Sequence, residues 1–295
     1  MISGPAPARP AITGIAFVAF RVGNEASAEH FYNKELGLRP IAGASGNTLY
    51  PVNRQQWIET RPNGAEAHVG REAAFGLVTS DINAMGRYLA GKGYLSTQGV
   101  MSNGVCEPVS QNQQLTVHDP EGNTVVFVQS GSASQLAQSP PTPNAISRRI
   151  IHAGFVVKSE AAENAFYHDV LGFKPYWHGG MRDGVTDWAS QQVPNGTDWI
   201  EYMLNIKPDA SPNTLGVMNH VSLGVEKMDS AVAQLATNGC DTAECKASKM
   251  GRDGKIQLNL YDPDHTRIEV MEFAPTGPVC CSPYSGSMPS SGDPQ

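Results

Sequence analysis

The strongest constraint on this chain is an internal repeat of about 140 residues. Residues 17–40 (FVAFRVGNEASAEHFYNKELGLRP) align without gaps over residues 152–175, and nine of the 24 positions are identical. Two further matches are WIE at 57–59 and 199–201, and the turn-and-strand segments at 118–128 and 261–271. A repeat this long predicts a duplicated domain rather than the short unit of a solenoid.

The chain length of 295 residues agrees with two domains of ordinary size. We expect an N-terminal domain over 11–130 and a C-terminal domain over 148–274. The segment between them, 131–147, is rich in Pro and Ser and has the composition of a linker. The last segment, 275–295, has a similar composition and is predicted to be a disordered tail.

Each domain contains a second, weaker repeat of the order strand-helix-strand-strand-strand, which predicts an α+β fold of four such modules per chain. Glycines and DP turns separate the elements. In the third module we expect a strand at 150–157, a helix at 160–171 and strands at 174–178, 185–191 and 198–204. In the fourth we expect a strand at 219–225, a helix at 229–238 and strands at 242–247, 255–261 and 266–272.

With these motifs the sequence resembles the vicinal oxygen chelate superfamily, which includes glyoxalases, extradiol dioxygenases, epimerases and antibiotic-resistance proteins. The resemblance covers 11–130 and 148–274 and depends on the ExAxxFY…LGF pattern, which occurs in both domains. It implies two tandem domains, each of paired βαβββ modules whose sheet forms a cup around a metal.

Four residues of the C-terminal domain fall on strands at positions that point into such a cup. They are His152, Glu201, His220 and Glu269, at intervals of 49, 19 and 49 residues. Equal outer intervals are expected when two equivalent modules each supply their first and last strand. The order His-Glu-His-Glu is similar to that of metal-binding glyoxalases. Two imidazoles and two carboxylates suit one divalent ion, which could be Ni, Co, Mn, Zn or Fe.

The N-terminal domain lacks these donors at the equivalent positions, and we expect its metal site to be degenerate. The repeat places Phe17 where the other domain has His152, and Val126 where it has Glu269. Ala74 lies near the position of His220, and Glu59 alone matches an acid. One carboxylate among apolar residues cannot hold a divalent ion.

Positions two residues from a ligand share its face of the sheet, so they are candidates for the substrate-binding wall. We predict that Trp199, Met203, Ser222 and Arg267 bind substrate. Arg267 either holds an anionic or carbonyl group of the substrate or pairs with a ligand carboxylate.

Our leading hypothesis is a metal-dependent lyase or isomerase of the glyoxalase type. In such an enzyme the metal polarises a carbonyl or stabilises an enediolate. Glu201 or Glu269 would then be the catalytic residue that moves a proton.

The alternative is an iron-dependent extradiol ring-cleaving dioxygenase that uses His152, His220 and Glu269. The four modules and the single metal domain resemble that branch. Against it, Glu201 would occupy a position that a catechol needs, and no histidine lies between His178 and His220. A further alternative is a small-molecule binding or resistance protein, although such binders generally lack the metal.

Composition limits the partners and leaves localisation open. A net charge of −7 argues against nucleic-acid binding, and no apolar run approaches a membrane span, so we expect a small-molecule substrate and a possible homo-oligomer. The N-terminus lacks the apolar core of a signal peptide, which favours a cytoplasmic protein without excluding an exported mature form. Five cysteines without a CxxC pair predict neither a disulfide framework nor a thiolate zinc site.

Overall fold

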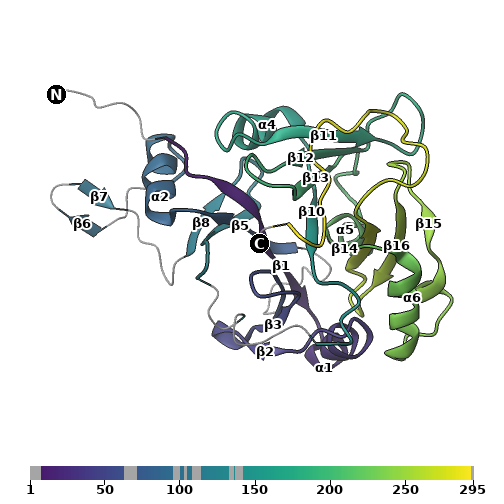
Figure 1. The fold of residues 1–295 in the computed structure, drawn as a ribbon. Coiled ribbons are helices and arrows are strands. Elements are labelled where there is room, and N and C mark those ends of the chain that lie inside the picture. The colour runs from purple at the N-terminus through teal and green to yellow at the C-terminus, as the bar shows by residue number, and fades with distance from the viewer. Residues whose placement is uncertain are drawn as a thin grey trace.

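The computed structural model consists of two curled sheets packed side by side, with helices on their outer faces (Figure 1). It describes residues 8–62, 72–95, 100–102, 105–107, 114–132, 136 and 142–293. Each sheet is built by one of the two predicted domains. The predicted α+β fold of two tandem vicinal oxygen chelate domains is therefore confirmed.

The first sheet contains seven strands of the N-terminal domain in the order β2-β3-β4-β1-β5-β9-β8. The strands are β1 (Ile12–Val22), β2 (Ile41–Ala42), β3 (Thr48–Pro51), β4 (Trp57–Pro62), β5 (Glu72–Thr79), β8 (Gln114–His118) and β9 (Thr124–Gln129). The helices are α1 (Glu25–Glu29), which continues as a π-helical turn over His30–Glu35, and α2 (Ile82–Gly91). Two short strands, β6 (Val100–Ser102) and β7 (Val105–Glu107), pair apart from this sheet.

The second sheet contains eight strands of the C-terminal domain in the order β11-β12-β13-β10-β14-β17-β16-β15. The strands are β10 (Ile150–Val156), β11 (Lys174–Gly179), β12 (Trp188–Gln192), β13 (Trp199–Met203), β14 (His220–Val225), β15 (Lys249–Met250), β16 (Ile256–Tyr261) and β17 (Arg267–Glu272). The helices are α4 (Glu160–Tyr167), α5 (Pro212–Met218) and α6 (Met228–Thr237). Helix α5, which Ser211 caps, was not predicted. The strand expected at 242–247 is instead a 3₁₀ turn at Glu244–Lys246.

In both sheets the first strands of the two modules lie antiparallel at the centre, and each module's last strand runs parallel beside its first. Thus β1 pairs with β5 and β4 in one sheet, and β10 pairs with β14 and β13 in the other. The four ligand-bearing positions of a cup are brought together by this arrangement, because they lie on the central strands and their parallel neighbours.

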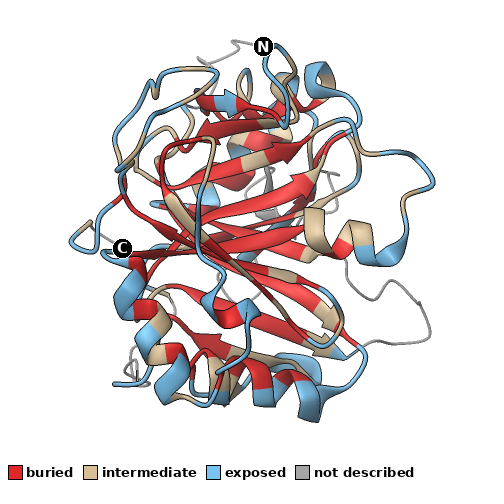
Figure 2. Ribbon diagram, turned by 90° about the vertical axis from the view of Figure 1, so that its right-hand side faces the viewer, coloured by how far each residue is buried: buried red, intermediate tan, exposed pale blue. Residues whose placement is uncertain are grey.

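The outer faces of the two sheets share one hydrophobic core, and buried residues line nearly every strand (Figure 2). Helix residues from both copies of the FY motif, Tyr32 and Tyr167, are fully buried in it. Each tyrosine reaches the DP turn of the other domain. Tyr32 donates a hydrogen bond to Asp262 over 3.0 Å, and Tyr167 donates one to Asp119 over 3.1 Å. The repeated motifs therefore join the domains as well as building each one.

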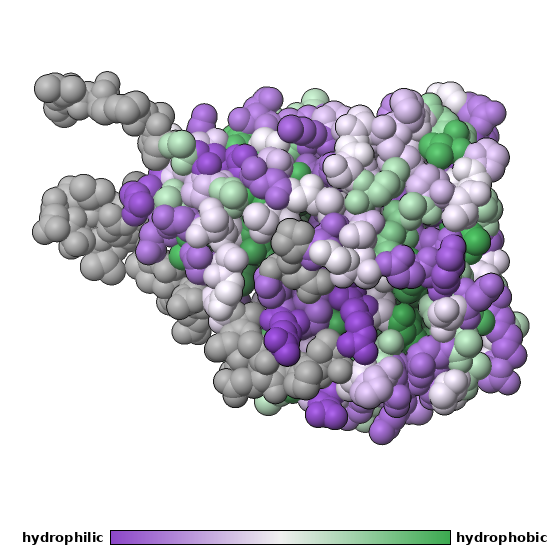
Figure 3. Space-filling model, viewed as in Figure 1, coloured by the Kyte–Doolittle hydropathy of each residue, from purple (hydrophilic) through white to green (hydrophobic). Residues whose placement is uncertain are grey.

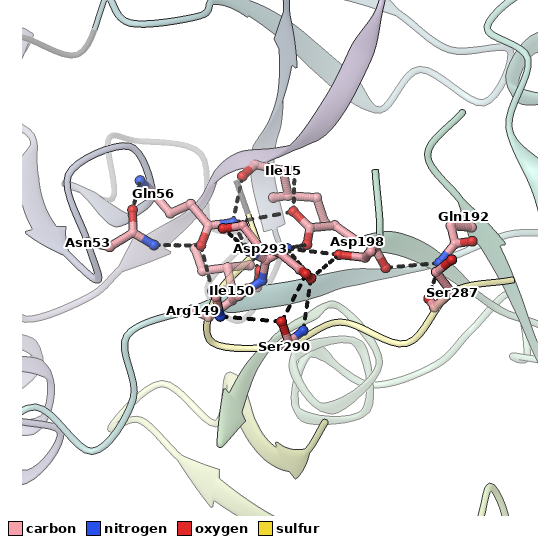
Figure 4. Close-up of polar contacts among 12 residues, drawn as sticks. Ile15, Asn53, Gln56, Arg149, Ile150, Gln192, Asp198, Ser287, Ser290 and Asp293 are labelled. Carbon is pink, nitrogen blue, oxygen red and sulfur yellow. Dashed lines mark hydrogen bonds and ion pairs between the residues drawn. The ribbon is translucent and has the colours of Figure 1, made fainter. Parts of the chain in front are cut away.

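A buried polar network joins the central strands β1 and β10 (Figure 4). The Gln56 amide nitrogen donates to the carbonyls of Ile15 and Ile150, at 2.9 and 3.0 Å. Asp198 accepts from the Ile15 amide at 2.9 Å and forms a buried ion pair with Arg149. Burial raises the pKa of Asp198 to about 6, although Arg149 opposes the shift. These hydrogen bonds provide partners for backbone groups of the two strands that would otherwise be buried without one.

The prediction of a disordered tail at 275–295 is wrong for its described part, residues 275–293, which we call the C-terminal strap. The strap runs beside the edge strand β11 and ends near the middle of the molecule, where Figure 1 marks the C-terminus. Its end is held by Asp293, which accepts a hydrogen bond from Thr197 at 2.6 Å and lies 3.5 Å from Arg149. Composition suggested disorder because the strap has few apolar residues of its own, but polar groups of the sheet bind it.

The cysteine spacing predicts no disulfide framework, but two local disulfides, Cys240–Cys245 and Cys280–Cys281, are present. The predicted linker falls partly outside the described residues. Its last part packs on the N-terminal domain, where the Ile146 amide donates to the Leu36 carbonyl at 3.1 Å. In the described part of the chain, no helix has the length and apolar character needed to cross a membrane.

Candidate metal centre

Three of the predicted ligands meet at the centre of the C-terminal sheet. His152 lies on β10, His220 on β14 and Glu269 on β17, and all three are buried. The strand register explains why they meet: His152 lies opposite Ser222, which in turn lies opposite Glu269, while His220 lies opposite Gly154. Neighbouring residues on paired strands project to the same face of a sheet, so the three side chains share the inner face.

The donor atoms converge closely enough to hold one ion. One ligand atom from each of His152, His220 and Glu269 lies within 4.8 Å of the others. The two Nε2 atoms are 3.0 Å apart, and His152 Nε2 is 3.2 Å from Glu269 Oε2. Two imidazole nitrogens and a carboxylate facing one buried point are the donor set of a divalent transition metal. The residues therefore fit the implied ion.

The fourth predicted ligand, Glu201, lies beside this group. Its Oε2 is 3.7 Å from His220 Nε2, and its Oε1 accepts a hydrogen bond from Ser190 at 3.3 Å. Among the described residues, the group of donors that lie within 4.8 Å of one another does not include Glu201. Its side chain is 13% exposed, against 6% for Glu269 and none for the histidines. Glu201 thus faces the space in front of the three donors.

Gly154 makes this packing possible. A Cβ atom at this position would lie 2.0 Å from Cε1 of His220. The space above Gly154 is therefore taken by the imidazole of His220. Any larger residue here would displace a proposed ligand.

His220 is held in the form that binds metals. Its Nδ1 lies 3.0 Å from the Met218 carbonyl, which leaves Nε2 facing Glu201 and Glu269. Burial lowers the pKa of His220 well below its ordinary value, and the adjacent Arg267 lowers it further. The Arg267 Nη2 atom is 2.9 and 2.8 Å from the two ring nitrogens. A neutral imidazole is the ligand form of histidine.

The pKa values of the two carboxylates, Glu269 and Glu201, are shifted in opposite directions. Burial alone would raise the pKa of Glu269, but Arg267 and His152 outweigh this and hold its pKa well below the ordinary value. Burial raises the pKa of Glu201, and His152 only partly opposes the shift. Glu269 is therefore held in the anionic form that a metal ligand needs, whereas Glu201 is the carboxylate better suited to exchange a proton.

A cavity of about 400 Å³ opens in front of the donors. Glu201 and Glu269 line it, and His152 and His220 form the floor beneath. Its other walls are mostly aromatic and thioether side chains with some basic and amide groups: Tyr176, Trp177, Met181, Trp188, Trp199, Met203, Met218, Met250, Met271, Tyr284, Lys249, Arg252, Arg267, Gln257 and Asn259. Such a cavity suits a flat, partly apolar molecule with polar substituents.

Three of the four predicted substrate-binding residues, Trp199, Met203 and Arg267, line this cavity. The placement of Ser222 is a correction. It is fully buried between His152 and Glu269 in the strand register, and it is not among the described residues that form the cavity wall. Of the two roles considered for Arg267, neither is seen directly, because its guanidinium group packs against His220.

Sequence reasoning missed two residues near the site, Lys255 and Tyr284. Lys255 has no exposed surface, and its Nζ lies 4.7 Å from the centre of the Trp199 ring. Tyr284 comes from the C-terminal strap and lines the cavity. An unusual buried lysine cannot be recognised in a sequence, and the strap was set aside by its composition.

The surface around the cavity differs from the rest of the molecule. The face seen in Figure 3 is mostly hydrophilic, with small hydrophobic patches. Among the described residues, the exposed large hydrophobic side chains are Met181, Met250 and Val279. Two of these line the cavity, and the third lies in the strap.

A larger groove of about 880 Å³, beside Arg54 and Arg148, contains none of the candidate ligands.

Comparison with known families agrees with this site. Residues 149–270 match the model of the Glyoxalase/Bleomycin resistance protein/Dioxygenase superfamily. The C-terminal domain belongs to this superfamily, which confirms the predicted vicinal oxygen chelate membership. None of the curated protein sequences matches the chain.

Solved structures match nearly the whole chain, so the likeness extends to both domains. The 2,3-dioxygenase LapB from Pseudomonas sp. KL28 has a TM-score of 0.64 at 15% identity, over 92% of this chain and 96% of that one. An extradiol ring-cleaving dioxygenase from B. fuscum has a TM-score of 0.64 at 17% identity, over 95% and 78%. Homoprotocatechuate 2,3-dioxygenase from Arthrobacter globiformis has a TM-score of 0.61 at 18% identity, over 93% and 86%. At these identities the likeness establishes the fold.

Proposed function

We propose that the protein is an iron-dependent extradiol ring-cleaving dioxygenase in which His152, His220 and Glu269 hold the metal. The observation that carries this proposal is the group of three donors, two imidazoles and one carboxylate within 4.8 Å. Such a facial triad with open positions is typical of non-haem Fe(II) oxygenases. The fold shared with ring-cleaving dioxygenases over both domains supports it. The proposal replaces the glyoxalase-type hypothesis as the leading one.

A divalent iron bound by the triad would supply the redox chemistry that dioxygen and a catechol require. The chain's own residues supply the rest. Glu201 lies at the cavity wall, 3.7 Å from His220, where its carboxylate can take a proton from a catechol hydroxyl group. Its raised pKa suits both uptake and return of that proton. Trp199 and Met203 form an apolar wall of the cavity, which would exclude water from the ring of the bound catechol.

A glyoxalase-type lyase or isomerase is the second candidate, and the position of Glu201 favours it. A carboxylate so close to His220 can act as a fourth ligand, which completes the His-Glu-His-Glu order seen in the sequence. In that case Glu201 or Glu269 would move a proton next to a substrate carbonyl group. The two candidates differ in metal, in the need for oxygen and in the number of ligands.

The deciding experiment loads metal-free protein anaerobically with Fe(II), Ni(II), Co(II) or Zn(II). Oxygen uptake is then measured with catechol, and isomerisation with the hemithioacetal of methylglyoxal and glutathione. We expect oxygen uptake and a ring-opened product with Fe(II) alone. Isomerisation with Ni(II), Co(II) or Zn(II), without oxygen uptake on catechol, would contradict the dioxygenase and support the second candidate.

A further inference from the structure

The C-terminal strap lies along the open edge of the catalytic sheet. Next to β11, Ser282 Oγ accepts a hydrogen bond from the His178 amide at 2.8 Å, and the Ser285 amide donates to the Tyr176 carbonyl at 2.9 Å. The Trp177 indole also donates to the Cys280 carbonyl at 3.2 Å. The strap therefore covers an edge strand and follows the rim of the cavity.

One strap residue, Tyr284, enters the cavity wall. Its ring centre lies 5.0 Å from that of Tyr176, and its hydroxyl donates to Asp253 Oδ2 at 3.0 Å. Both of these partners also line the cavity. The ring of Tyr284 is thus fixed at its edge by a hydrogen bond and at its side by an aromatic neighbour.

The face of the Tyr284 ring is held by a buried cation. Lys255 Nζ lies 5.2 Å from the centre of this ring and 4.7 Å from that of Trp199. Within the described part of the chain, this ammonium group has no hydrogen-bond partner, and it makes cation–π contacts with the faces of the two rings instead. Burial lowers its pKa to about 8, while Asp253 and the carboxylates of the site oppose the shift, so it stays cationic at neutral pH.

This contact connects the strap to the metal ligands. The Trp199 ring, on the other side of the lysine, lies 4.8 Å from the ring of His152. His152, Trp199, Lys255 and Tyr284 therefore form one continuous column from the floor of the site to the strap. A change at either end of such a packed column moves its neighbours.

We propose that Tyr284 is a specificity-determining residue of the metal-site cavity and that Lys255 is the positioning residue that fixes its ring. The inference rests on the proposed function, since it assigns one wall of that site. Loss of the ring would open the cavity beside Trp199 toward the strap. A substrate with a bulky ring substituent would then gain access, whereas an unsubstituted catechol would gain little.

The test compares catechol with 4-tert-butylcatechol in the Fe(II)-loaded protein. For Tyr284→Ala we expect the ratio of kcat/KM for the bulky catechol to that for catechol to rise about tenfold, because pocket contacts of a few carbons have effects of this size. Tyr284→Phe keeps the ring and should keep the ratio. Lys255→Met should also raise the ratio, as Tyr284→Ala does. Lys255→Arg keeps the positive charge and should leave the ratio near the wild-type value. Ser291→Ala, elsewhere in the strap, is the matched control.

Two outcomes overturn the inference. One is an equal change of kcat/KM for both catechols in Tyr284→Ala, since a structural role would affect both alike. The other is an unchanged rate of acrylamide quenching of tryptophan fluorescence in Tyr284→Ala and Lys255→Met, where we expect faster quenching as Trp199 becomes accessible. Quenching needs no catechol and no turnover. If the wild-type protein cleaves neither catechol, the proposed function fails while quenching still decides the role of Tyr284.

Discussion

The two domains place the same backbone positions around two cups, and among the described residues only the C-terminal cup brings together candidate metal ligands. Phe17 lies opposite Trp57 in the N-terminal sheet, and His152 lies opposite Trp199 in the C-terminal sheet. By the same registers, Ala74 corresponds to His220 and Val126 to Glu269. The difference between the apolar cup and the cup with the candidate metal ligands is thus three side chains on the same strand frame.

The apolar cup uses its positions for packing. The rings of Phe17 and Trp57 are stacked with centres 4.8 Å apart, the same separation as between His152 and Trp199. The one acid, Glu59, is bound by Arg61 at 2.8 Å and Asn47 at 2.7 Å. Glu201, at the equivalent position, is held less tightly: it accepts a hydrogen bond from Ser190 at 3.3 Å and lies 3.7 Å from His220. The proposed function therefore needs a carboxylate without a cationic partner as strong as Arg61, as well as the three ligands.

The largest effect is expected from paired substitutions at Glu269 and Val126. Glu269→Ala removes one of three ligands and should weaken metal binding by more than about 100-fold, beyond the effect of altering an outer-shell partner. Val126→Ala makes the same kind of truncation in the other cup and should leave metal content unchanged. Metal analysis after dialysis against a weak chelator measures both. Equal metal retention in the two variants would place the metal site elsewhere.

The next effect concerns the two equivalent acids. Glu201→Gln should lower kcat by roughly 10² to 10⁴-fold, the usual contribution of a general base, while metal content stays near that of the wild type. Glu59→Gln should change neither, since its partners lie in the apolar cup. Turnover and bound iron are measured on the same samples. Loss of metal from Glu201→Gln would show that Glu201 is a ligand and would favour the glyoxalase-type candidate.

Much of this comparison could be predicted from the sequence. The repeat makes Phe17, Ala74 and Val126 equivalent to His152, His220 and Glu269. Strand periodicity then fixes that these positions share the inner face of each sheet. By the same alternation Glu272, three residues beyond Glu269, faces the other side of the sheet, where it accepts a hydrogen bond from the Met228 amide at the start of α6.

What could not be predicted depends on contacts between distant segments. Ser222 shares the face of the ligands, as alternation predicts, but its side chain is fully buried between the neighbouring strands and does not reach the cavity wall. Lys255 is buried only because Tyr284 and Trp199 enclose it from segments on either side. The strap is ordered by the sheet's own polar groups, which no local composition can indicate.

A smaller effect is expected where the domains differ at their shared contact. Glu163 lies beside Asp119, and the repeat places Ala28 at the equivalent position of the other domain. Burial, together with the neighbouring Asp119, raises the pKa of Glu163 to about 8. Its contribution to stability is therefore complete below the unfolded pKa of 4.5 and is lost as pH rises toward 8.

Glu163→Gln removes this ionisation but keeps an oxygen to accept the Glu121 amide, which bonds Glu163 at 3.1 Å. We expect the variant to gain stability over the wild type between about pH 5 and 8 and to keep a constant advantage above that range. Urea unfolding at a series of pH values measures the difference. A pH-independent difference would mean that Glu163 ionises normally in the folded protein.

The smallest effect distinguishes Tyr32 and Tyr167, the two tyrosines of the repeated FY motif that form hydrogen bonds between the domains. Tyr32→Phe removes the tyrosine hydroxyl that donates to Asp262 Oδ2. Tyr167→Phe removes the hydroxyl that donates to Asp119 Oδ2, but this oxygen still accepts a hydrogen bond from the Asn123 side chain at 2.8 Å. We therefore expect losses in unfolding free energy of about 2 kcal/mol for Tyr32→Phe and about 1 kcal/mol for Tyr167→Phe. Urea unfolding at pH 7 measures both, and Tyr88→Phe, which removes a partly buried hydrogen bond to the Val170 carbonyl, is the control. A larger loss for Tyr167→Phe would show that Asn123 does not compensate, and that the two halves of the domain contact are closer to equivalent than their hydrogen bonds indicate.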